Sequence, residues 1–193
     1  MANGERRARA RDACVNELST SWAPADIANP STIGTIGEHL VCADLRKQGY
    51  ISFFASSDCA YDVVLDTSSR LLRVQVKTTR KIGPRRNKTS DMPTWEFKLF
   101  RSASCYDGPR FYENGEYDIL ATVALDISLI AYFPYSSSRR NCITLRSADY
   151  LHLEKNHWPG KYFQDHPLEK VLKILQEQRE TADWVLGEPV ARG

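Results

Sequence analysis

The sequence lacks an apolar stretch long enough to cross a membrane. The longest, over residues 119–133, is interrupted by Thr122, Asp126 and Ser128, and it is shorter than the roughly 18 residues that a spanning helix requires. The basic N-terminus is followed by neither an apolar run nor a small-residue cleavage pattern, so no secretory signal is predicted. We therefore expect a cytoplasmic protein with no membrane partner.

Several motifs that indicate common enzyme classes are also missing. The five cysteines are widely spaced, without a CxxC or CxxH pair, which favours free thiols over disulfides or zinc ligands. The four histidines never pair at helical spacing with a third ligand, so neither a zinc hydrolase nor an HNH-type nuclease is supported. Without a GxxxxGKS/T or GxGxxG sequence, NTPase and dinucleotide-binding functions are disfavoured.

The net charge is small but unevenly distributed. The 26 basic and 24 acidic residues leave a formal charge of +2, which does not by itself indicate a nucleic-acid partner. Eight basic residues and no carboxylate nevertheless lie between positions 70 and 88, namely Arg70, Arg73, Lys77, Arg80, Lys81, Arg85, Arg86 and Lys88. Such a cluster either attracts a phosphate backbone through counterion release or forms a solvated loop.

The length of 193 residues is enough for one main domain with extensions. We expect a basic N-terminal arm over 1–30, a core over 31–150, and a C-terminal helical extension over 151–193 whose last dozen residues form a tail. Apolar residues at steps of three and four predict a helix from Ser31 to Gly49. An amphipathic helix is predicted after Pro167.

Between these helices the sequence is typical of strands. Two short runs rich in β-branched residues, 61–66 and 71–77, are separated by the polar turn TSSR, which predicts a β-hairpin. The turn formers within 102–116 predict a long surface loop. Further strands are predicted over 94–100, 117–125, 129–134 and 142–145.

One face of the predicted hairpin carries polar side chains that a structural strand does not need. Because side chains alternate along a strand, Arg73, Gln75 and Lys77 share one face. Hairpin pairing brings Asp62 near that face, and a buried carboxylate normally requires a partner. On the first helix Glu38 lies on the flank of the apolar stripe, from where it can point at a site beside the sheet.

These residues resemble a known set of motifs. The segments Gly34-x-x-Gly37-Glu38, Gly49-Tyr50, Tyr61-Asp62-Val63-Val64 and Val74-Gln75-Val76-Lys77-Thr78 are similar to the PD-(D/E)XK nuclease superfamily. More narrowly, they resemble the branch of group I intron-encoded homing endonucleases, and more distantly archaeal Holliday junction resolvases. The resemblance implies an α/β fold with a restriction-endonuclease-like αβββαβ core, in which helices flank a central mixed sheet. It also implies a divalent-metal site and phosphodiester hydrolysis.

The resemblance implies roles for individual residues. Asp62 takes the place of the motif's invariant aspartate, Lys77 that of its lysine, and Glu38 matches a helix glutamate found in many members. Tyr61 replaces the usual preceding proline, which is a common variation. Gln75 occupies a position where most members have Glu or Asp, which lowers the negative charge available to a metal and can mark an inactive enzyme. The homing endonuclease branch also has glutamine there, which favours activity.

The chemistry of these residues is consistent with that assignment. Mg²⁺ prefers six oxygen ligands and keeps several waters. Asp62, Gln75 and the Val76 carbonyl are therefore candidate ligands, with Glu38 at a second metal or a water, and Mn²⁺ is a plausible substitute. A metal would help to generate a hydroxide, while Lys77 would orient the water or offset developing charge. The candidate catalytic residues are Glu38, Asp62, Gln75 and Lys77.

The sequence thus predicts a metal-dependent endonuclease that acts on double-stranded DNA, of site-specific homing type. Because one active site cuts one strand, double-strand cleavage calls for a homodimer or homotetramer. A Holliday junction resolvase and a restriction-like nuclease remain alternatives within the same chemistry. The alternative from a different class is a catalytically inactive DNA-binding module on a nuclease fold.

Basic residues beside the active strand are predicted to bind the DNA, namely Arg73, Arg80, Lys81, Arg85, Arg86 and Lys88. Replacing Arg85 and Arg86 with alanine is expected to weaken binding across sequences and to flatten the slope of log K against log salt by about one unit per lost contact. Titrations of a labelled duplex over a salt series measure this slope. An unchanged slope would contradict the phosphate contacts.

Overall fold

The computed structural model describes residues 29–80, 93–101, 110–136, 141–153 and 159–186. Backbone proximity divides the chain into two units, 1–32 and 33–193. Apart from the first residues of the first described helix, all described elements belong to the second unit. None of the helices in these ranges is long and apolar enough to span a membrane.

The predicted helices and the predicted β-hairpin are present. In chain order the elements are helix α2 (Pro30–Lys47), strands β1 (Ile51–Phe54), β2 (Val63–Asp66), β3 (Leu71–Thr79), β4 (Trp95–Lys98), β5 (Phe100–Arg101), β6 (Arg110–Phe111), β7 (Ile119–Ala124), β8 (Leu129–Pro134) and β9 (Cys142–Leu145), the 3₁₀ turns η1 (Ala148–Leu153) and η2 (Phe163–Asp165), and helix α3 (Leu168–Leu186).

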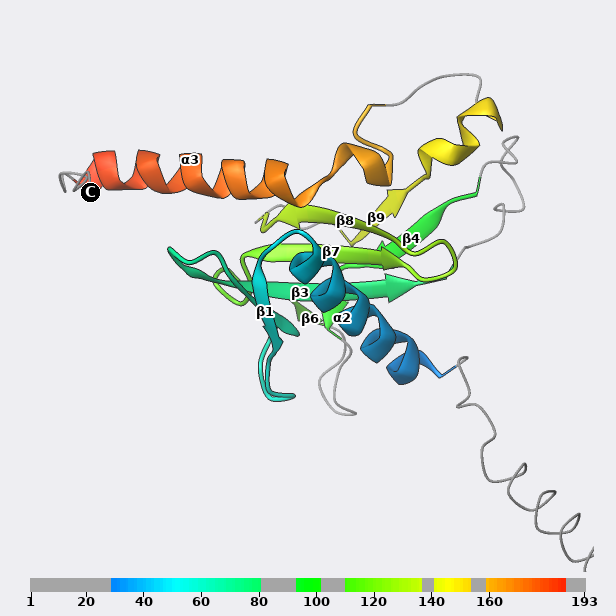
Figure 1. Ribbon diagram of the computed structural model, residues 1–193, viewed down its shortest axis with the longest axis horizontal. Helices are drawn as coiled ribbons and strands as arrows, with labels where there is room; N and C mark the ends of the chain where they lie inside the picture. Colours follow the sequence, from blue (N-terminus) through cyan, green and yellow to red (C-terminus); the bar gives the residue numbers. More distant parts are fainter. Residues whose placement is uncertain (1–28, 81–92, 102–109, 137–140, 154–158, 187–193) are drawn as a thin grey trace, which may run out of the picture. The chain divides into compact units, whose positions relative to one another are not determined.

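Five strands form a central mixed sheet in the order β1-β2-β3-β7-β8 (Figure 1). β1, β2 and β3 are antiparallel neighbours, β7 runs parallel to β3, and β8 runs antiparallel to β7. A parallel pair of strands needs a crossover connection. The described residues between β3 and β7 form β4, β5 and β6, whereas the αβββαβ order has a helix at this place. β4 pairs with β9, and β5 pairs with β6.

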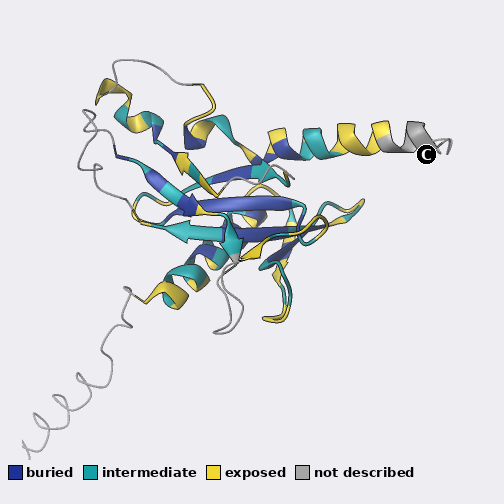
Figure 2. Ribbon diagram, turned by 180° about the vertical axis from the view of Figure 1, so that it is seen from behind, coloured by how far each residue is buried: buried dark blue, intermediate teal, exposed yellow. Residues whose placement is uncertain are grey.

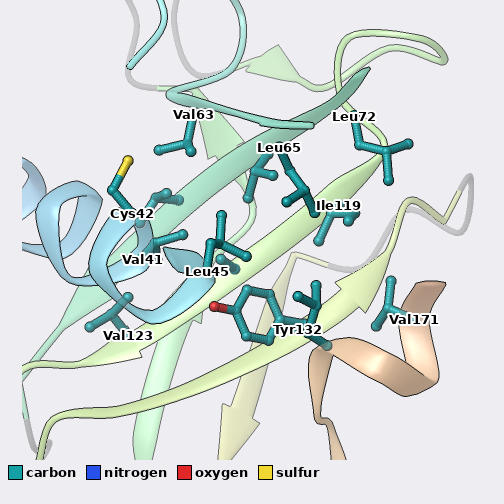
Figure 3. Close-up of a cluster of buried hydrophobic side chains, with 14 residues drawn as sticks. Val41, Cys42, Leu45, Val63, Leu65, Leu72, Ile119, Val123, Tyr132 and Val171 are labelled. Atoms are coloured by element: carbon teal, nitrogen blue, oxygen red, sulfur yellow. The ribbon is translucent and has the colours of Figure 1, made fainter. Parts of the chain in front are cut away.

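The sheet separates two hydrophobic clusters. On one face, alternate residues of the central strands pack against α2 and the start of α3 (Figure 3), a cluster that includes Val41, Leu45, Val63, Leu65, Val74, Val76, Ile119, Val123 and Val171. A second cluster contains Trp95, Phe97, Ala124, Ala131, Leu145 and Phe163. Because Val74 and Val76 face the first cluster, the alternation of β3 turns Gln75 and Lys77 to the opposite face.

Polar contacts also fix α2 on the sheet. The Tyr132 hydroxyl of β8 donates to Asp44 Oδ2 at 2.6 Å, and the buried Ser52 Oγ of β1 donates to the Cys42 carbonyl at 3.1 Å. Burial and the Asp44 carboxylate both raise the pKa of Tyr132, so its hydroxyl keeps the proton that it donates. The helix is therefore held over strands at both edges of the sheet.

Helix α3 is longer than the sequence predicted. Leu168 and Val171 are buried beside β8, whereas residues 176–181 are exposed (Figure 2). The helix continues to Leu186, so the prediction of a tail from residue 182 onward was wrong for its first five residues. The physical reason is that QEQRETAD contains good helix formers and no helix breaker before Gly187.

Strand β1 was not predicted, although it completes the edge of the sheet. It is only four residues long, and Ile51, Phe53 and Phe54 are exposed while Ser52 is buried. Apolar residues outside and a serine inside reverse the usual alternation of a half-buried strand. The pattern therefore carried no strand signal.

An ion pair ties β3 to the residue that precedes β7. Asp118 Oδ2 accepts hydrogen bonds from the Arg73 backbone N at 2.8 Å and from its Nε at 3.0 Å, and Oδ1 accepts one from Nη2 at 3.0 Å. Arg70 adds an ion pair at 3.6 Å. Burial raises the pKa of Asp118, but the hydrogen bonds and charge of Arg73 outweigh it, so the pKa lies below its usual value.

Replacing Asp118 with asparagine is expected to lower the free energy of unfolding near neutral pH by about 1 kcal/mol, since it removes a charge-assisted pair that solvent partly screens. The pKa of Asp118 is lower in the folded protein than in the unfolded chain, where it is about 4, so the ionised carboxylate stabilises the fold at pH values above about 4. This stabilisation is lost as the pH falls through the pKa that Asp118 has in the folded protein. Urea unfolding at about pH 7 and about pH 3 measures the difference. Exposed Asp58→Asn is the control, and an equal loss at both pH values would contradict the assignment.

Candidate active site

Asp62 lies directly before β2 and is held by both neighbouring strands. Its carbonyl accepts a hydrogen bond from Ala55 N at 2.9 Å, and its own N donates to the Val74 carbonyl at 3.0 Å. The β2–β3 pairing ends at Val63 and Val74. One residue further, Asp62 Oδ2 accepts from Val76 N at 2.7 Å, so the carboxylate satisfies a strand donor that has no ladder partner there.

Gln75 is buried beside this carboxylate. Its Nε2 donates to Asp62 Oδ2 and, at 3.1 Å, to the Val76 carbonyl. An amide is compatible with a neighbouring carboxylate because its nitrogen is a donor, whereas a glutamate here would add a second negative charge. Nε2 donates both hydrogen bonds and therefore lies beside Asp62 Oδ2 and the Val76 carbonyl. For Oε1 to ligate a cation together with those two oxygens, the amide group of Gln75 would have to turn.

Glu38 reaches the same region from α2. Burial raises the pKa of its carboxyl, the charge of Asp62 raises it further, and His39 offsets part of the rise. The charges of the two carboxyl groups therefore act on each other. That Glu38 points at a site beside the sheet stays a prediction.

Lys77 lies two residues beyond Gln75 and is held by the β5–β6 hairpin. Its Nζ donates to the Phe100 carbonyl at 3.1 Å and lies 5.1 Å from the centroid of the Tyr112 ring. An aromatic face attracts an ammonium group, so both contacts favour the charged lysine. Sequence reasoning missed Tyr112 because it placed 102–116 in a loop; the signal was the aromatic spacing of FYENGEY around an Asn-Gly turn.

The six residues that were predicted to bind DNA lie at different places in the structure. The Arg73 guanidinium is bound to Asp118 and donates to the Gly115 carbonyl, so it holds the sheet together at the start of β7. Arg80 is exposed directly after β3. The remaining four, Lys81, Arg85, Arg86 and Lys88, lie outside the described residues, and their contact with phosphate stays a prediction.

The side chains that converge here match a hard divalent cation. Their donors are all oxygens: the carboxylates of Asp62 and Glu38, the amide oxygen of Gln75 and the Val76 carbonyl. Among the described residues no group of three or more His, Cys, Asp and Glu is placed to hold a metal, which disfavours a zinc-type cage there. Mg²⁺ needs only one or two carboxylates because it keeps several waters, and a cation would relieve the repulsion between Glu38 and Asp62.

Comparisons with known proteins identify the fold and the family of the chain. The chain is similar to the solved structure of a bacterial homing endonuclease, I-Ssp6803I, with 19% sequence identity and a TM-score of 0.56 over 78% of this chain and 95% of that chain. This likeness confirms the restriction-endonuclease-like fold. A comparison with curated proteins found no match. A family model described as PD-(D/E)XK endonuclease matches residues 28–158, well over half of the sequence, and the chain therefore belongs to the PD-(D/E)XK endonuclease family.

Proposed function

We propose that this protein is a metal-dependent DNA endonuclease of homing type. Family membership supports phosphodiester hydrolysis, and the likeness to a homing endonuclease supports the type. The observation that carries the proposal is the network at the end of the β2–β3 pairing, in which Asp62 binds Val76 N and Gln75 while its charge acts on Glu38.

The oxygen donors at this site would hold Mg²⁺, with Mn²⁺ as a substitute. Asp62, Oε1 of Gln75 and the Val76 carbonyl would ligate the ion, and Glu38 would bind a second ion or a water. When bound, the metal lowers the pKa of a water and stabilises negative charge on the phosphate. Asp62 needs no reorientation for this role because its backbone and carboxylate are already fixed by hydrogen bonds.

The other side chains have roles that follow from their charge. The ammonium group of Lys77 would offset the negative charge that develops on the phosphate, since a positioned cation stabilises a transition state without reorganisation. The raised pKa of Glu38 makes its carboxylate a better proton acceptor than an ordinary glutamate, so it would orient a water or take its proton. Arg80, beside the end of β3, would contact a flanking phosphate.

A second candidate function is a DNA-binding module that has lost catalysis. The hydrogen bond from Gln75 to Asp62 favours it, because an amide donor stabilises the aspartate without any cation. This candidate uses the same fold and the same substrate. It differs only in whether a phosphodiester bond is broken.

Asp62→Asn and Lys77→Ala are each expected to lower the cleavage rate by about 10²-fold or more, because each removes a charge that acts in the transition state. Duplex binding should remain. The measurement is nicking of supercoiled plasmid and of an intron-lacking target with Mg²⁺, Mn²⁺ or EDTA. Asp66→Asn is the matched control, since Asp66 lies at the other end of β2 and its Oδ1 accepts from Ser68 N in the turn.

The same assay separates the alternatives. Cleavage of the intron-lacking duplex alone supports the homing type, cleavage of a four-way junction supports a resolvase, and cleavage of short sites in unrelated plasmids supports a restriction-like enzyme. Sedimentation of the protein with its substrate tests the expected homodimer or homotetramer. A wild-type protein that binds duplex DNA but nicks no substrate in either metal would establish the inactive module.

The aromatic contact of Lys77 gives a separate prediction. Tyr112→Leu should lower the cleavage rate by about 2- to 30-fold, the equivalent of a lost cation–π contact. Tyr112→Phe keeps the ring and should remain close to wild type. Single-turnover rates of the two variants measure the difference, and equal rates would contradict a role for the ring.

A further inference from the structure

Helix α2 and strand β3 meet at a contact that admits no side chain on the helix. Gly37 is buried, and a Cβ built on it would lie 1.7 Å from Thr78 Oγ1, 2.9 Å from Thr78 Cβ and 3.0 Å from Thr78 Cγ2. Any residue other than glycine would therefore have to push the helix away from the strand. The two backbones lie closer together here than an alanine would allow.

This contact lies between two candidate active-site residues. Gly37 directly precedes Glu38 on the helix, and Thr78 directly follows Lys77 on the strand. Thr78 belongs to the face of β3 that also carries Val74 and Val76, so it points toward α2. The height of the helix above this point therefore decides how far the Glu38 carboxyl reaches toward Asp62.

Both partners of the contact carry a cost. Glycine in the middle of a helix is less favourable than alanine. The Thr78 hydroxyl is buried and has no hydrogen-bond partner among the described residues, and an unsatisfied buried hydroxyl is unfavourable. Locally unfavourable features of this kind are concentrated at functional sites.

A second glycine on the same helix shows that the contact is specific. Gly34 lies three residues earlier, and a Cβ built on it would meet no atom within 4 Å. An alanine is therefore sterically acceptable at position 34 and not at position 37. Only the glycine beside Glu38 is required by packing.

We propose that Gly37 is a positioning residue for the metal site, which acts by setting the distance between the Glu38 carboxyl and Asp62. The inference rests on the proposed function, because the quantity it controls is the affinity of these carboxylates for a divalent cation. A methyl group on residue 37 moves α2 outward and carries Glu38 with it. The site then loses the carboxylate that would hold the second ion or a water, while Asp62, which is fixed by the sheet, stays in place.

The experiment measures Mg²⁺ binding by calorimetry on the full chain. Gly37→Ala should weaken Mg²⁺ binding by about 10- to 100-fold, the usual range when the support of a ligand is disturbed. Gly34→Ala, the same substitution one turn away, should bind Mg²⁺ like wild type. Thermal unfolding in EDTA shows that the compared variants are folded at the temperature of the titration.

Two further comparisons separate positioning from a general loss of structure. Thr78→Gly removes the three atoms nearest to the new methyl. Gly37→Ala/Thr78→Gly should therefore bind Mg²⁺ more tightly than Gly37→Ala does, and Thr78→Gly alone is its reference. In a Glu38→Gln background, Gly37→Ala should cost no additional affinity because the carboxylate through which it acts is gone. An equal loss in both backgrounds would overturn the inference.

The possible failures are distinguishable. If wild type binds Mg²⁺ and cuts DNA while folded Gly37→Ala binds Mg²⁺ as tightly, the inference fails and the proposed function stands. If wild type binds no Mg²⁺ and cuts nothing, the proposed function fails. If Gly37→Ala does not fold, Gly37→Ala/Thr78→Ala takes its place, because of the three nearest atoms only Thr78 Cβ, at 2.9 Å, then remains. Weaker Mg²⁺ binding in that folded variant than in Gly37→Ala/Thr78→Gly would support the inference, and equal binding in the two would overturn it.

Discussion

The geometry of the candidate active site depends on the hydrogen bond between the Asp62 carboxylate and the backbone N of Val76. Where the β2–β3 ladder ends, Val76 N would be left without a partner, and Asp62 Oδ2 accepts from it. The same oxygen accepts from Gln75, and its charge raises the pKa of Glu38 after the larger effect of burial. An asparagine oxygen could still accept a hydrogen bond from Val76 N. Asp62→Asn therefore removes the charge at this position while keeping the hydrogen bond that supports the fold.

Gln75 affects both how tightly the site binds a cation and how stable the site is when no cation is bound. A glutamate at this position would add a third carboxylate to Asp62 and Glu38. Burial raises the pKa of Glu38, and the charge of Asp62 already raises it further. The amide replaces one repulsion with a hydrogen bond. We therefore expect a site that is more stable when empty and that binds a divalent cation less tightly than a three-carboxylate site would.

Local alternation predicted the part of the site that the hairpin carries. The period of two along 71–77 placed Gln75 and Lys77 on one face and brought Asp62 beside them, as the structure confirms for Asp62 and Gln75. Contacts between distant segments could not be predicted in this way. Arg73 was assigned to DNA from its charge alone, because its partner Asp118 is 45 residues away. Tyr112 reaches Lys77 only through the pairing of β5 with β6.

The packing of the hydrophobic core and the arrangement of the candidate active site require the same register of β3. A slip of one residue would exchange the faces of the strand, placing Gln75 and Lys77 in the cluster under α2 and turning Val76 toward the polar residues. Burying an amide and an ammonium among aliphatic side chains would be strongly unfavourable. The pairing of β3 with both β2 and β7 resists the same slip. The hydrophobic cluster therefore determines which side chains of β3 face the polar site, although none of its side chains takes part in the proposed chemistry.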